Sequence, residues 1–173
     1  MARNSLLADW AGYITSGTIG SGVTFPAGHV INYVTVLNTT GSGAQASDDG
    51  ATFGSSVTIS SPENDSIIIV WAIGGKAQIV ANGTNRKTRC GIDFAQTGAS
   101  GTPNFYFSGA TEGHANYAGS YASAPGSAMA EYTSDGTNDI VISCRCGRYD
   151  SYSGEWDATA ASPIRIIAME IKQ

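Results

Sequence analysis

The hydrophobic positions of the chain fall in short runs rather than at the spacing of a helix. β-Branched and aromatic residues gather in these runs, and Gly, Ser, Asn, Asp and Pro separate them, which is typical of strands joined by turns. The predicted strands are His29 to Leu37, Thr52 to Ile59, Ser66 to Ile73, Lys76 to Ala81, Lys87 to Phe94, Asn104 to Ser108, Ser127 to Thr133, Asp139 to Arg148 and Pro163 to Lys172. Because no helix intervenes to make a parallel sheet, the pattern predicts an all-β, antiparallel β-sandwich or jelly roll.

Two of the predicted strands have no polar side. The run from Ile67 to Ile73 is apolar without a break, and the closing strand from Pro163 to Lys172 has apolar residues on both sides. A strand of this kind lies in the middle of a sandwich or at a contact between subunits. The sequence leaves both readings, core or subunit interface, open for Ile67, Ile69, Trp71, Ile167, Met169 and Ile171.

The first 22 residues are expected to form an arm ahead of the domain. Ser5 to Tyr13 is the one helical candidate, with the alternative of an irregular arm, and the glycine-rich stretch at 17–22 separates it from the rest. The predicted organisation is therefore an N-terminal arm at 1–22 and a β-sandwich domain at 23–173.

The charge of the chain argues against nucleic acid as a partner, and the length of its apolar runs argues against a membrane span. Only 13% of the residues are charged and the net charge is −5, whereas phosphate backbones need several converging cations. Arg86, Lys87 and Arg89 are the densest basic cluster, and a solvated strand face is favoured over an anion site. The longest apolar run is too short to span a bilayer. Asp9 interrupts the N-terminus before a signal peptide can form, so we expect synthesis in a cytoplasm.

Candidate catalytic and metal chemistry is sparse. The three cysteines, Cys90, Cys144 and Cys146, are too few for a disulfide framework and are interpreted as small core thiols. A zinc site would need ligands beyond these, and His29 and His114 are the only histidines. Neither histidine lies near a nucleophile motif. We therefore expect a protein that is not an enzyme and has no metal or cofactor.

One loop combines aromatic and acidic residues. Carboxylates there could bind calcium, and the aromatic rings could stack on a sugar. A hydrated acidic tip, with Trp156 packed beneath its own loop, is the simpler interpretation. The candidate ligand residues are Tyr149, Asp150, Tyr152, Glu155, Trp156 and Asp157.

Three segments resemble a widespread group of bacteriophage structural proteins found in tail-fibre tips, head fibres and similar virion components. They are TFPAGHVI at Thr24 to Ile31, SIIIV at Ser66 to Val70 after Ser60-Ser61-Pro62, and PIRIIAMEI at Pro163 to Ile171. The match covers nearly the whole chain, from Val23 to Gln173. The chain departs from the group at Ser60 to Asn64, where Thr-Pro-Ser-Ser is usual, and it lacks a fibrous shaft.

The resemblance implies a jelly-roll domain that forms homotrimers, broadly similar to the complement C1q and tumour-necrosis-factor heads. It implies a virion structural protein, and the favoured form is a capsid decoration (cement) protein on the capsid surface that binds the major capsid protein or other virion proteins. The residues expected to anchor the arm to the capsid are Leu6, Leu7, Trp10, Tyr13 and Ile14.

The alternative is the receptor-binding head of a tail fibre, spike or head fibre. Its loops around Tyr117 to Tyr121 and Tyr149 to Asp157 would contact a host surface glycan. A glycan hydrolase is a third and weaker reading, because it rests on the acidic loop alone.

Overall fold

The computed structural model describes residues 14–15, 18–19, 27–79, 86–96, 104–113, 123–148 and 153–173. Two short strands, β1 (Ile14–Thr15) and β2 (Thr18–Ile19), pair with each other. The remaining strands are β3 (Val30–Asn38), β4 (Ala51–Ile59), β5 (Asn64–Ile79), β6 (Arg86–Gln96), β7 (Asn104–Gly113), β8 (Ser123–Asp135), β9 (Ile140–Arg148), β10 (Gly154–Asp157) and β11 (Ile164–Ile171).

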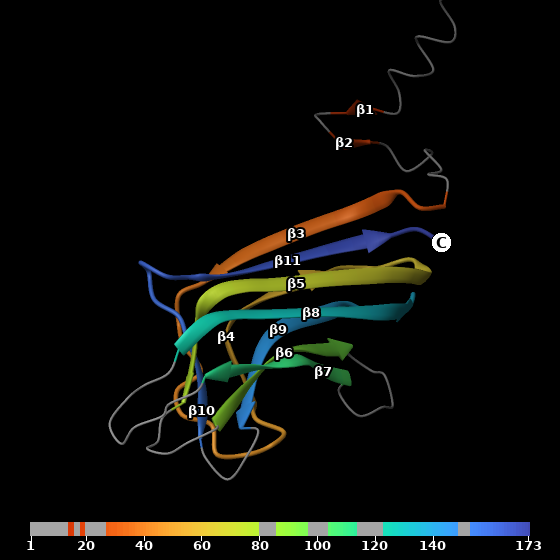
Figure 1. The fold of residues 1–173 in the computed structure, drawn as a ribbon. Helices are drawn as coiled ribbons and strands as arrows, with labels where there is room; N and C mark the ends of the chain where they lie inside the picture. The colour runs from red at the N-terminus through yellow and green to blue at the C-terminus, as the bar shows by residue number, and fades with distance from the viewer. Residues whose placement is uncertain are drawn as a thin grey trace, which may run out of the picture.

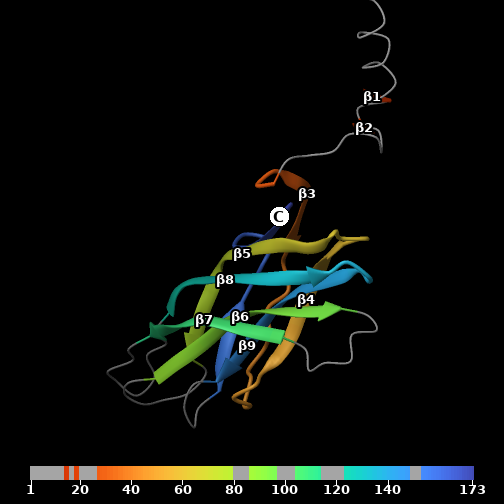
Figure 2. The same cartoon turned by 90° about the vertical axis from the view of Figure 1, so that its right-hand side faces the viewer.

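These longer strands form two antiparallel sheets. The first contains β3, β11, β5 and β8 side by side, with β10 beside the part of β5 that extends beyond the start of β11 (Figure 1). The second has the order β4-β9-β6-β7. Figure 2 shows β5 and β8 in one layer and β6, β7 and β9 in the other. The predicted all-β sandwich is confirmed.

The strands pair like a long hairpin whose two arms have been rolled up together. β3 pairs with β11, β4 with β9, β5 with β8, and β6 with β7, and every pair is antiparallel. Strands of the first half of the domain thus pair with those of the second half in reverse order. This pairing, spread over two facing sheets, is that of a jelly roll.

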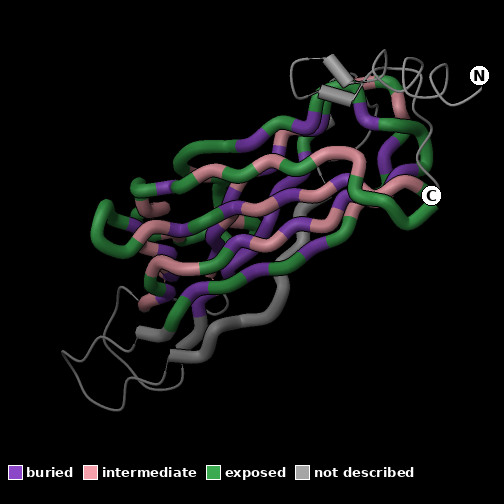
Figure 3. The backbone as a smooth tube through the Cα atoms, turned by 90° about the horizontal axis from the view of Figure 1, so that it is seen from above, coloured by how far each residue is buried: buried purple, intermediate pink, exposed green. Residues whose placement is uncertain are grey.

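The core lies between the two sheets and is built mainly from alternate residues of β4, β5, β6, β8, β9 and β11. Along β5 and β11 the inward residues are almost fully buried while their neighbours are less so (Figure 3). Phe94 stacks on Tyr132 across the layers, with ring centroids 5.1 Å apart. The largest fully buried side chains include Trp156, Phe94, Ile59, Ile68, Ile140, Ile142 and Ile164.

Some predicted boundaries are wrong. β7 continues past the predicted end at Ser108 to Gly113, and β8 begins at Ser123 instead of Ser127. The largest difference is in β5. The sequence suggested separate strands at Ser66 to Ile73 and Lys76 to Ala81, but β5 runs continuously from Asn64 to Ile79. Gly74 and Gly75 have φ values of 111° and 63°, a region that glycine enters without a steric penalty. The glycines therefore bend the strand instead of ending it, and the Gly75 NH donates to the Pro163 carbonyl at 3.1 Å.

Candidate interaction surface

The outward side of the first sheet is a grid of side chains fixed by the strand registers. Each row crosses the sheet in the order β3, β11, β5, β8, and we call the whole set the outer grid. Its rows are Leu37, Arg165, Ile73 and Ser127; Thr35, Ile167, Trp71 and Met129; Tyr33, Met169, Ile69 and Glu131; and Val30, Ile171, Ile67 and Thr133.

Most of the outer grid is apolar and open to solvent. Tyr33, Ile73 and Met129 are 57%, 53% and 58% exposed, and Val30 and Leu37 are nearly as open. On the two central strands, Ile73 and Arg165 of the first row are exposed, and the residues of the other three rows are half-buried by their neighbours. Four strands at about 4.8 Å spacing and seven residues at about 3.3 Å give a patch of roughly 440 Å². This area includes the polar positions of the grid, and the largest apolar patch on a typical monomer, about 300–600 Å², is often functional.

The outward side of the second sheet is different in kind. Over β4, β9 and β6 its polar residues are Thr52, Thr58, Ser143, Arg145 and Asp93, and its apolar residues are Val141 and Ala95. The Arg145 guanidinium forms an ion pair with the Asp93 carboxylate at 3.1 Å, with both side chains largely shielded from solvent. Arg145 also donates to the backbone carbonyl of Asp49 at 2.6 Å. The two charged groups on this side are thus paired within the subunit, so the two faces of the sandwich are not equivalent.

Six residues that the sequence placed at a subunit interface or in the core share one surface. Ile67, Ile69, Trp71, Ile167, Met169 and Ile171 all lie on the outer grid, in neighbouring positions of β5 and β11. The residues that lie between them along the two strands, such as Ile68 and Ile166, point inward and fill the core. The apolar runs of these strands therefore divide between two surfaces.

Other residues of the outer grid were not predicted as site residues. Tyr33, Thr35 and Leu37 alternate with the more buried Val34 and Val36 in β3, a signal that the sequence does contain. Met129 and Glu131 join the grid only because β8 pairs with β5 in a particular register. A single sequence does not specify that register, because it depends on which strands become neighbours.

The predicted anchoring residues lie largely outside the described part of the chain. Leu6, Leu7, Trp10 and Tyr13 fall there, while Ile14 is described as the first residue of β1, where it pairs with Ile19. The anchoring role stays a prediction.

The aromatic and acidic loop is described only in part. Tyr149, Asp150 and Tyr152 lie outside the described residues, whereas Glu155, Trp156 and Asp157 belong to β10, a strand that the sequence did not predict. Glu155 accepts a hydrogen bond from the Gln78 side-chain amide at 2.7 Å across the β10–β5 pair. Among the residues whose positions are described, no group of three or more His, Cys, Asp and Glu could hold a metal ion.

Trp156 is a core residue in this structure. Its side chain is fully buried, and the indole NH donates to the Gly74 carbonyl at 2.9 Å. The ring packs edge-on against Phe53, with centroids 5.9 Å apart. The indole is therefore not exposed for stacking on a sugar, and Trp156 instead holds β10 against the bend of β5.

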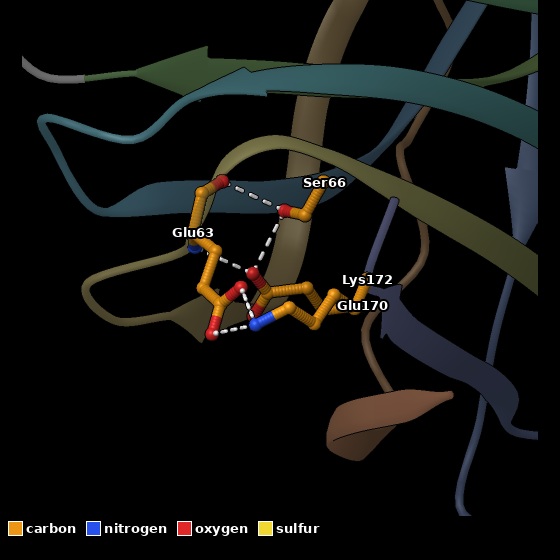
Figure 4. Close-up of polar contacts among 4 residues, drawn as sticks. All are labelled: Glu63, Ser66, Glu170 and Lys172. Atoms are coloured by element: carbon orange, nitrogen blue, oxygen red, sulfur yellow. Dashed lines mark hydrogen bonds and ion pairs between the residues drawn. The ribbon is translucent and has the colours of Figure 1, made fainter. Parts of the chain in front are cut away.

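One end of the sandwich is held by a buried carboxylate (Figure 4). Glu170 is 3% exposed and accepts hydrogen bonds from the Glu63 NH at 2.7 Å and the Ser66 hydroxyl at 2.8 Å. Lys172 forms an ion pair with Glu63 at 2.9 Å on the more exposed side. This cluster ties the turn before β5 to the end of β11.

The three cysteines lie in the core and form no disulfide. Burial raises the pKa of Cys144 to about 12 against an opposing hydrogen bond from Asn38. Burial likewise raises the pKa of Cys146 to about 11. A protonated thiol is a poor nucleophile and a poor metal ligand, so the positions of Cys144 and Cys146 suit packing. No helix in the part of the chain that is described could cross a membrane.

No protein-family model and no curated protein matches the sequence. Among solved structures, the chain is similar to part of dimeric latent PorU from Porphyromonas gingivalis, with a TM-score of 0.43, 11% identity, and coverage of 87% of this chain and 14% of that one. It is also similar to infectious bursal disease virus VP2 in a subviral particle, with a TM-score of 0.41, 10% identity, and coverage of 92% and 37%. The CBM22-1 xylan-binding domain from Paenibacillus barcinonensis Xyn10C has a TM-score of 0.31 and 8% identity, with 87% of this chain and 99% of that chain covered.

These similarities are distant, with identities of 8% to 11%. The chain covers only 14% of the PorU chain and 37% of the VP2 chain, so it spans a minor part of each.

Proposed function

We propose that this chain is a structural protein of a bacteriophage virion, a decoration protein that forms homotrimers on the capsid surface. The observation that supports it is the mainly apolar outer grid, which covers one face of a jelly roll whose other described face is largely polar. A subunit built in this way has a core of its own. Covering its apolar face with another protein removes further apolar surface from water, which is favourable. A place in a phage virion is supported by the resemblance to phage virion proteins, which lies in Thr24–Ile31, Ser66–Val70 and Pro163–Ile171.

In this proposal the chain is made in the host cytoplasm and acts without catalysis or a cofactor. The arm at 1–22 attaches each subunit to the major capsid protein or to another virion protein through Leu6, Leu7, Trp10, Tyr13 and Ile14. Three arms act together in a trimer, so modest individual contacts sum to durable attachment. Deleting residues 1–22 should leave a folded trimer that no longer attaches to capsids, and normal decoration by this deletion variant would refute the anchoring role.

Copy number on purified particles is the decisive test of the proposal. Quantitative protein staining against the major capsid protein should give hundreds of copies per particle for a lattice-wide decoration protein. A few to some tens would contradict decoration and support the receptor-binding head of a fibre or spike. In that case the next measurement is adsorption to host cells by variants of Tyr149 and Tyr152, which the alternative places against a surface glycan.

A further inference from the structure

We infer that the outer grid is covered by a second copy of this chain, and that Arg165 of one copy lies against Glu131 of the next. This inference rests on the proposed homotrimer and adds to it the surface that is used and the pair of charges that sets its register.

The two charges of the outer grid carry the argument. Arg165 lies in the first row on β11, and Glu131 lies in the third row on β8. Both are exposed, and neither side chain has a hydrogen bond or ion pair with any other described residue of the subunit. They contrast with Arg145 on the opposite face, whose guanidinium is paired with Asp93.

An unpaired charge restricts what can cover the surface around it. Removing a charged group from water is unfavourable unless the partner supplies an opposite charge or hydrogen bonds. The molecule that covers the outer grid must therefore bring an anion to Arg165 and a cation to Glu131, and must be apolar elsewhere. A second copy of the chain meets all three conditions with the same residues.

The positions of the charges suit contact between unlike halves of the grid. Arg165 belongs to the half formed by β3 and β11, and Glu131 to the half formed by β5 and β8. They are two strands and four residues apart, which corresponds to about 17 Å. Contact between like halves would bring Arg165 to Arg165 or Glu131 to Glu131, whereas unlike halves bring Arg165 to Glu131. Unlike halves can meet twice about a two-fold axis in an isologous contact, or once with each neighbour in a heterologous contact that closes into a ring of three, and the proposed homotrimer takes the second form.

Charge reversal tests the register directly. Arg165→Glu and Glu131→Arg each place like charges together, so either variant should raise the dissociation constant of the oligomer about tenfold or more. The double variant Arg165→Glu/Glu131→Arg restores the opposite pair and should return the constant to within about threefold of the wild-type value. Lys76→Glu and Asp49→Arg make the same changes of charge outside the outer grid and should have little effect.

The measurement is light scattering after size-exclusion chromatography over a dilution series, with circular dichroism to confirm that each variant is folded. A wild-type chain that stays monomeric would overturn both self-association and this inference. An oligomer that neither single reversal weakens, or that the folded double variant does not restore, would overturn the register alone. The decoration role is judged separately, by the copy number on particles.

Discussion

The buried thiols give the folded chain a particular response to alkaline pH. Cys144 and Cys146 have pKa values of about 12 and 11 in the folded chain, against the ordinary value of 9.0. As the pH rises above about 9, the thiols of the unfolded chain lose their protons first. The folded chain then holds more protons than the unfolded chain. The free energy of unfolding should be unaffected by these groups below pH 9 and should fall as the pH rises toward 11 and 12.

Urea unfolding at pH 8 and pH 10.5 measures this decline. A variant with Cys144→Ala and Cys146→Ala should be less stable at pH 8, because two core side chains are shortened, yet should lose less stability between the two pH values than the wild type. Equal losses in the two proteins would show that the thiols do not titrate as their burial requires.

Gly126 tests the packing of Trp156. A Cβ atom at Gly126 would overlap the indole of Trp156, which is itself fully buried and bonded to Gly74. We expect Gly126→Ala to lower the free energy of unfolding by about 1–3 kcal/mol, the usual cost of overfilling a core. Ser127→Ala, at the neighbouring exposed position, is the control and should change it by less than about 0.5 kcal/mol. An unchanged urea midpoint for Gly126→Ala would mean that the indole can move aside.

At the scale of single elements, the turn before β5 depends on the end of β11. Glu170 receives hydrogen bonds from the Glu63 NH and the Ser66 hydroxyl in a buried place. Glu170→Ala would leave both donors without this acceptor, so we expect a loss of about 1–3 kcal/mol in the free energy of unfolding.

The exposed ion pair nearby provides the contrast to Glu170. Lys172→Ala removes only the contact with Glu63, where the side chains are 24% and 49% exposed, and solvent screening limits the expected loss to under about 1 kcal/mol. Thermal and urea unfolding of the two variants measure the difference. Equal effects would contradict the central role of the buried carboxylate.

Most of the elements could be predicted from the sequence because each strand contains its own alternation or apolar run. The exceptions have local causes. Gly74 and Gly75 look like a chain reversal, but here they bend β5 while its pairing with β8 resumes at Lys76. β10 was missed because Gly154–Asp157 is polar at alternate positions and short, and its strand character comes from pairing with β5.

At the scale of the whole molecule, the outer grid should control assembly without controlling folding. Trp71 lies in the middle of the grid, half-buried between Ile167 and Met129. Trp71→Glu places a charge in the centre of the proposed contact, so we expect a folded monomer where the wild type is an oligomer. Thr58→Glu adds the same charge on the polar face and should leave the mass unchanged. A Trp71→Glu protein that keeps the wild-type mass in light scattering would show that another surface is used.

The candidate surface was only partly predictable. The sequence identified the apolar residues of β5 and β11, because both faces of those strands are apolar, but it could not tell which face was inside. Arg165 and Glu131 could not have been related to each other, since β11 and β8 become neighbours of β5 only through the rolled topology.

The same rolled pairing has a consequence for biosynthesis. β3 pairs with β11, and the hydrogen bond from Thr35 to Ile166 joins residues 131 positions apart in the chain. Within the described residues, β11 is the strand that pairs with β3. Because β3 precedes β11 by more than 100 residues in the chain, β3 leaves the ribosome early and stays without its partner until β11 has been made. Strand pairs between segments far apart in the sequence form slowly. An uncharged, apolar strand is meanwhile open to contacts with other nascent chains, so yield in the host should depend on how quickly translation reaches Ile164–Ile171.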